Sequence, residues 1–211
     1  MVMVFLRRRL DRLATRFPGG PEGNRHLTAL LGALLLAGIV IELATLLLGL
    51  QQTLPVHIFV GVALIPIVAL KLGSTGWRMI RYYMRAPAYR GEGPPRPLLR
   101  AIAPLVVGST VALLGSGVGL VVAGPHAHFF RALHSASFAL FLLVVGAHAV
   151  AHVPKLRRFA FADWASGRRA EGHVVRRAAA AFVLVAGGAL AVAALQSAGP
   201  WLTAIQHSLN G

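Results

Sequence analysis

Long blocks of apolar residues, separated by short polar stretches, dominate the hydrophobic pattern of the chain. Five such blocks occur, at about residues 27–50, 54–76, 101–123, 131–153 and 177–198. Each is close to the roughly 20 residues that an α-helix needs to cross about 30 Å of hydrocarbon. The pattern therefore predicts an all-α integral membrane protein, with five transmembrane helices in a lipid bilayer.

The composition agrees with this class of protein and narrows the chemistry. Of the 211 residues, 56% are hydrophobic and 13% are charged, and the apolar residues are gathered in blocks rather than scattered as in a soluble core. The chain has no cysteine, which excludes a CxxCH site for covalent haem, a cysteine-ligated iron–sulfur cluster and a disulfide. Any haem would therefore be bound non-covalently, through imidazole.

The basic residues are distributed unevenly between the two sides of the predicted bundle. Of the 21 Lys and Arg residues, all except Lys71 and Arg131 lie in the N-terminal arm 1–26 or in the connections 77–100 and 154–177. Because cytoplasmic loops carry such an excess, we expect a bacterial plasma membrane protein with its N-terminus inside and its C-terminus outside. The same rule, with contacts to anionic lipid headgroups, accounts for the net charge of +15 without nucleic-acid binding. The apolar run of the arm precedes its arginines, so a cleavable signal peptide is not expected.

The polar stretches are too short to form a substrate-binding domain of their own. We expect a basic cytoplasmic arm at residues 1–26 and a four-helix transmembrane core at residues 27–155. A basic cytoplasmic loop at residues 156–176 and a fifth helix with an outer tail at residues 177–211 would follow. Residues 81–100, rich in Pro, Gly, Tyr and Arg, are expected to form an irregular surface connection rather than a helix. Chemistry should then take place inside the bundle or on a partner protein.

Two pairs of polar residues recur at the same interval inside the apolar blocks. His134 and His148 stand 14 residues apart, and so do His57 and Lys71. On a helix, this interval is about 40° short of four full turns and corresponds to a rise of roughly 21 Å. Each pair therefore lies on one helix face. Two such helices, side by side, can present two opposed ligand pairs, as two stacked b-type haems require.

His57 and His134 form the predicted outer pair. Both lie early in their blocks, and the two helices run in the same direction, so we expect the two side chains at similar depth near the outer face. A buried imidazole in hydrocarbon needs a partner for its nitrogens. The two rings can fill both axial positions of one haem iron. The alternative is a pair of interfacial histidines bonded to water or backbone.

Lys71 and His148 form the predicted inner pair, in which the lysine is chemically unusual. A lysine must lose its proton before it can ligate iron, although burial favours the neutral form. Three interpretations stay open: a neutral Lys71 ligates iron, a charged Lys71 pairs with a haem propionate, or the side chain extends to the inner interface. His152, one turn after His148, can replace it as the ligand or bond a propionate.

Glu42 is an ionisable residue inside the first apolar block, where such groups are costly and usually paired or protonated. It can handle protons beside a quinone site, balance the charge of Arg131, or form a neutral hydrogen bond to a neighbouring helix. Gly115 and Gly119 have GxxxG spacing, which allows the close approach of another helix or leaves room for a flat macrocycle.

Three stretches, LPVHIFVGVALIPIVALKLGSTGWRMIRYY, PAYRGEGPPRPLLRAIAPL and ALHSASFALFLLVVGAHAVAHV, resemble an actinobacterial branch of the cytochrome b561 and respiratory cytochrome b-subunit superfamily. The resemblance covers about residues 27–155. It implies a four-helix core with haem b as cofactor, which passes electrons between a quinone pool and a partner oxidoreductase. The ligands of that pattern carry over to His57, His134 and His148. Lys71 stands where the family has a fourth histidine.

We therefore predict a di-haem or mono-haem b-type cytochrome, with iron ligands from His57, His134 and His148 and with Lys71 or His152 completing the inner site. It would be an electron-transfer subunit of an oxidoreductase rather than a stand-alone enzyme. The alternative is a membrane protein without a redox role, either a scaffold or assembly subunit or a small proton-coupled transporter. In that case the histidines and Lys71 would line a polar pathway with Glu42 as the proton carrier.

Overall fold

The computed structural model describes residues 19–91, 97–165 and 171–210, and all of their regular secondary structure is helical. The elements are α2 (Gly20–Leu47), α3 (Leu50–Tyr83), α4 (Pro87–Arg90), α5 (Pro97–Ala123), α6 (His128–Phe159), α7 (His173–Ser197) and α8 (Gly199–Asn210). Most of the predicted basic arm, as well as residues 92–96 and 166–170 of the basic connections, lies outside the described residues.

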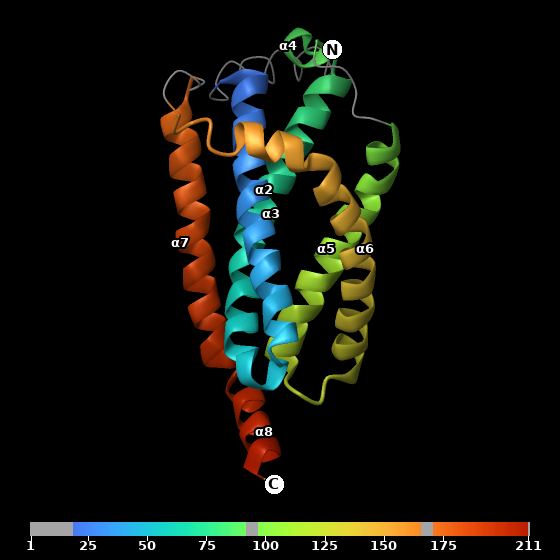
Figure 1. Cartoon of the computed structure of the whole chain (residues 1–211), viewed down its shortest axis with the longest axis vertical. Coiled ribbons are helices and arrows are strands. Elements are labelled where there is room, and N and C mark those ends of the chain that lie inside the picture. Colours follow the sequence, from blue (N-terminus) through green and yellow to red (C-terminus); the bar gives the residue numbers. More distant parts are fainter. Residues whose placement is uncertain (1–18, 92–96, 166–170, 211) are drawn as a thin grey trace, which may run out of the picture.

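Five helices in the described ranges, α2, α3, α5, α6 and α7, are long and apolar enough to cross a membrane. This confirms the predicted all-α membrane bundle. The five helices run up and down in chain order, so that α3 and α6 point in the same direction (Figure 1). Below, the end of the bundle at which α2 begins is called the Gly20 end. The opposite end, at which α2 turns into α3, is called the Gly49 end.

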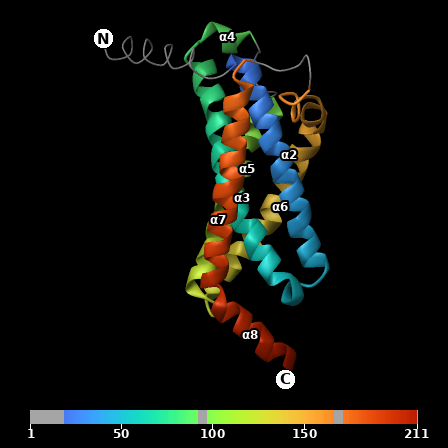
Figure 2. The same cartoon turned by 90° about the vertical axis from the view of Figure 1, so that its left-hand side faces the viewer.

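The five long helices pack as two pairs and one additional helix. α2 lies against α3 and α5 lies against α6, with fewer contacts between the two pairs, through α2 with α6 and α3 with α5. α7 lies along α3 on the side away from α5 and α6 (Figures 1 and 2). An apolar cluster shared by α2, α3 and α7 holds this side together, and it consists of Leu27, Leu31, Leu64, Ile67 and Val183.

The connection after α3 contains more helix than the sequence analysis predicts. α3 continues through Arg81 to Tyr83, α4 forms a short helical turn, and α5 already begins at Pro97. The prediction of an irregular connection over 81–100 is therefore wrong for these parts. No Gly or Pro follows Gly76 until Pro87, so nothing breaks α3. The buried guanidinium of Arg81 also lies 5.8 Å from the ring of Trp77 and 6.0 Å from that of Tyr89.

The uncharged tail forms a helix, α8, that the sequence analysis does not predict. α8 leaves the Gly49 end at an angle to the bundle (Figure 2). The indole Nε1 of Trp201 donates a hydrogen bond of 2.8 Å to the carbonyl of Leu120 in α5, and the guanidinium of Arg131 lies 5.7 Å from the indole ring. These contacts fasten the first turn of α8 to the ends of α5 and α6.

Candidate functional site

His57 of α3 and His134 of α6 face each other between the two helix pairs. Their ring centroids are 6.3 Å apart and their ring planes are nearly perpendicular, at 83°. Both side chains are only partly exposed. The structure thus brings together, at one level of the bundle, the two histidines that the sequence analysis expects at similar depth.

The hydrogen bonds around His57 determine which ring nitrogen carries the proton. Nδ1 pairs with the carboxylate of Glu42 and lies 3.1 Å from the hydroxyl of Thr45. That hydroxyl donates its one proton to the carbonyl of Glu42, at 2.6 Å, so toward the ring it acts as an acceptor. Both partners of Nδ1 are therefore acceptors. Nδ1 carries the proton and, in the neutral ring, Nε2 keeps its lone pair.

The partners of His134, all from α5, lead to the same assignment. Nδ1 lies 3.1 Å from the carbonyl of Leu113 and 3.2 Å from the hydroxyl of Ser116. The Ser116 hydroxyl donates to the carbonyl of Ala112, at 2.6 Å, which leaves it as an acceptor toward the ring. Nδ1 is again the donor, and Nε2 of the neutral ring keeps its lone pair. Gly117 makes room for the ring, because a Cβ atom there would lie 3.3 Å from Cε1 of His134.

This arrangement fits two axial ligands of a haem iron. Metal-bound histidines use one ring nitrogen while the other is turned to a carboxylate or carbonyl, and here the Nδ1 atom of His57 contacts the Glu42 carboxylate and that of His134 the Leu113 carbonyl. With metal–nitrogen bonds of about 2 Å, two opposed imidazoles have centroids roughly 6 Å apart, close to the observed 6.3 Å. The described residues contain no group of three or more acidic or histidine side chains able to hold a bare metal ion. A donor set of two imidazoles suits a metal that brings further ligands with it.

The helix that carries His134 is only loosely covered on its bundle side. In α6, Ser137 and Val144 are the only buried residues, and both lie on the helix face that carries His134 and His148. The two helix pairs meet at few points along this face. Little side-chain packing would therefore be lost if a flat group lay between α3 and α6.

The inner pair is arranged differently from the outer pair. The amine of Lys71 donates a hydrogen bond of 2.9 Å to the carbonyl of Thr28 in α2. His148 stacks on His152, with centroids 4.2 Å apart, and Nδ1 of His152 donates to the His148 carbonyl at 2.9 Å. Nδ1 of His148 is buried and has no hydrogen-bond partner among the described residues. The structure thus contains two inner histidines near each other, with the lysine turned toward α2.

Glu42 and Arg131 do not meet. Glu42 pairs with His57 across the α2–α3 interface, whereas Arg131 donates a 2.6 Å hydrogen bond to the carbonyl of Pro125. The structure therefore places Glu42 against a neighbouring helix, beside a candidate ligand, and does not pair it with Arg131.

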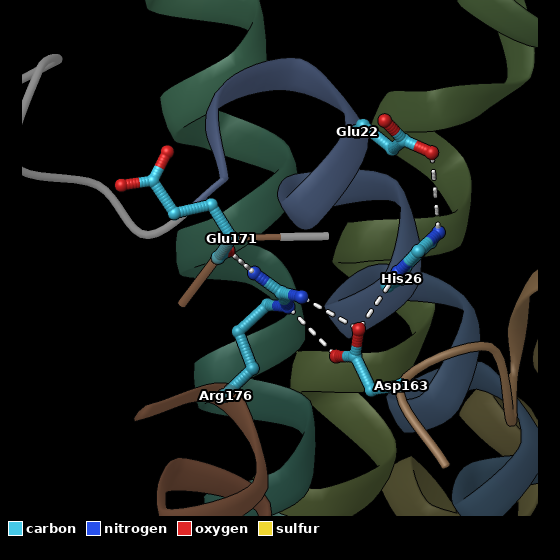
Figure 3. A network of polar contacts seen from close by, with 5 residues as sticks. All are labelled: Glu22, His26, Asp163, Glu171 and Arg176. Atoms are coloured by element: carbon cyan, nitrogen blue, oxygen red, sulfur yellow. Dashed lines mark hydrogen bonds and ion pairs between the residues drawn. The ribbon is translucent and has the colours of Figure 1, made fainter. Parts of the chain in front are cut away.

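A second polar cluster, at the Gly20 end, was missed by the sequence analysis. Asp163 follows α6 and accepts two hydrogen bonds from Arg176 of α7, at 2.8 and 2.6 Å, and one of 2.8 Å from Nδ1 of His26 in α2 (Figure 3). All three side chains are buried. Burial alone would raise the pKa of Asp163, but the hydrogen bonds and charges of Arg176 and His26 outweigh it, so this pKa lies below its ordinary value. The sequence signal is weak: Asp163 and Glu171 are the only acidic residues between Lys155 and Arg177.

The fold and the site together define a multi-pass helical membrane protein in which His57 and His134 face each other between two helix pairs. No family model, curated protein or solved structure matches the chain.

Proposed function

We propose that this protein is a membrane-embedded b-type cytochrome that carries electrons between a quinone pool and a partner oxidoreductase. One haem b would be held between α3 and α6 by His57 and His134. The observation that carries the proposal is the pair of facing rings whose Nδ1 atoms are both occupied by acceptors from neighbouring helices. Among the described residues, no hydrogen bond involves Nε2 of either ring, and two histidines with a purely structural role would not require both of these atoms to lack a partner.

The residues of the chain would hold and tune the cofactor. When bound, haem supplies a one-electron couple, and the electron passes without covalent change in the protein. His57 and His134 would hold the haem through Nε2. Glu42, Thr45, Leu113 and Ser116 fix the orientation and tautomer of the two rings. In this proposal the chain is an electron-transfer subunit of an oxidoreductase rather than a stand-alone enzyme.

A second haem at His148 is part of the proposal. His148 and His152 stack on each other in α6. Nδ1 of His148 is buried and has no hydrogen-bond partner among the described residues, and a buried polar atom of this kind normally has one. A group bound beside His148 would supply that partner. Lys71 donates to the Thr28 carbonyl, which a neutral and a charged amine can both do, so the proposal includes Lys71 either as a neutral iron ligand or as a cation beside a propionate.

The proposed orientation follows from the basic residues. The Gly20 end would face the cytoplasm of a bacterial cell and the Gly49 end, with α8, would face outward. The His57–His134 site would then lie in the outer half of the membrane, and the His148 site in the inner half.

The test is haem content and spectrum of the full chain, extracted in detergent from haem-replete cells. The pyridine haemochrome assay should detect haem b, and reduction with dithionite should shift and sharpen the Soret band. His57→Ala and His134→Ala should each remove the same haem, whereas His128→Ala, an exposed histidine at the start of α6, should keep it. His148→Ala should lower the haem-to-protein ratio by one. A colourless wild-type protein would refute the proposal and favour a scaffold subunit or transporter.

A further inference from the structure

The two facing histidines have unequal partners on Nδ1. His57 pairs with a carboxylate, that of Glu42, in addition to the hydroxyl of Thr45. His134 has a backbone carbonyl and a hydroxyl, both neutral, from Leu113 and Ser116. One ring is therefore held by a formal negative charge, and the other is not.

Among the described residues, the polar contact of the Glu42 carboxylate is with His57. The Glu42 side chain is 17% exposed and makes an ion-pair contact with Nδ1 of His57. Neither carboxylate oxygen has a hydrogen-bond partner among the described residues. Gly61, one turn after His57, lies under the carboxylate, since a Cβ atom at this position would be 3.4 Å from Oε1. A carboxylate inside a membrane helix is costly. In this structure, the contact with His57 offsets the free-energy cost of placing the Glu42 carboxylate inside the membrane.

The chemical effect of such a partner is well defined. A carboxylate that accepts the Nδ1 proton pulls this proton toward itself and raises the electron density at Nε2. A more electron-rich ligand stabilises ferric iron relative to ferrous iron and so lowers the reduction potential. A neutral carbonyl or hydroxyl has a weaker effect, because hydrogen bonds to charged acceptors are about twice as strong as neutral ones.

We infer that Glu42 is the positioning residue of His57: it fixes the Nδ1–H tautomer and the orientation of the ring, and it holds the reduction potential of the haem low. This inference rests on the proposed function, in which His57 is an axial ligand. The difference between the surroundings of His57 and of His134 would then come from Glu42, a partly exposed acidic residue on a third helix, α2.

The experiment is a potentiometric titration of the full-length, haem-loaded protein in detergent. Glu42→Gln keeps the shape and a hydrogen-bond acceptor but removes the charge. We expect the reduction potential of the His57–His134 haem to rise by about 59 mV or more, which is a tenfold change in the preference for ferric iron in a one-electron couple. Glu22→Gln is the matched control. It removes a carboxylate from an exposed position at the other end of α2 and should leave the potential unchanged.

The outcomes separate this inference from the proposed function. Haem that is retained in Glu42→Gln with an unmoved potential overturns the inference alone, whereas a wild-type protein without haem overturns both. If Glu42→Gln loses haem, Glu42→Asp decides, because it restores a carboxylate on a shorter side chain. Haem bound by Glu42→Asp with a potential near that of the wild type supports the inference, and equal loss in both variants overturns it.

Discussion

Replacement of Asp163 by alanine should be the most destabilising single change in the buried cluster at the Gly20 end. The carboxylate accepts three hydrogen bonds, two from Arg176 and one from His26. Without it, the guanidinium of Arg176, 2% exposed, keeps its charge but loses its counter-ion. The contacts that join α2, the end of α6 and the start of α7 are lost at the same time (Figure 3).

The expected magnitude follows from the burial of both partners. Removing one member of a buried ion pair costs about 3–5 kcal/mol, because the remaining charge is left uncompensated. For a chain of this length that corresponds to a fall in Tm of roughly 10 °C. The double variant Asp163→Leu with Arg176→Met removes both charges and should recover most of the loss, since apolar replacement of a whole buried pair is close to neutral.

The same cluster predicts a direction of pH dependence. The pKa of Asp163 is depressed in the folded state by its hydrogen bonds with Arg176 and His26, while in the unfolded chain it lies at about 3.9. The stabilisation is therefore fully present above about pH 4 and is lost as the pH falls through the lower, folded-state pKa. The difference in Tm between the wild type and Asp163→Ala should shrink in that acidic range.

The assay is thermal unfolding in detergent, followed as the loss of the monodisperse peak in size-exclusion chromatography of heated samples. If Asp163→Ala lowers the free energy of unfolding by less than about 1 kcal/mol, the cluster contributes no more than an exposed ion pair does, and the reasoning is refuted. A double variant as unstable as the single one would refute it as well, because the loss would then not come from an uncompensated charge.

Two further predictions concern helix contacts. Gly187→Ala should lower the free energy of unfolding by about 1–3 kcal/mol through overpacking, because its Cβ atom would lie 2.5 Å from the carbonyl oxygen of Ala63 in α3. The matched variant Gly188→Ala, whose Cβ atom would meet open space, should be neutral or slightly stabilising. The same thermal assay compares the two variants. Trp201→Phe should cost about 0.5–1.5 kcal/mol through loss of the hydrogen bond to Leu120, and it should expose the α8 backbone to faster hydrogen exchange, whereas unchanged exchange would contradict an anchoring role for the indole.

The helices themselves are largely predictable from the sequence. Apolar blocks of membrane-spanning length are a strong signal, and all five correspond to helices in the structure. The ends are less predictable, because contacts made elsewhere decide them. α3 continues to Tyr83 while Arg81 packs against Trp77 and Tyr89, and α8 forms while Trp201 is fastened to α5.

By itself, the sequence determined the level at which the histidines meet. Five apolar blocks require α3 and α6 to run in the same direction, and positions early in both blocks then bring His57 and His134 to one depth, where their rings face each other. This follows from chain connectivity and helical rise, which are local properties.

Only the tertiary structure decided what each polar group contacts. Glu42 pairs with His57, Lys71 turns to the carbonyl of Thr28, and Asp163 binds Arg176 and His26. Each of these contacts depends on how one helix is rotated about its axis relative to another, and that rotation is set by the packing of many side chains at once. The hydrophobic pattern along one helix does not carry this information.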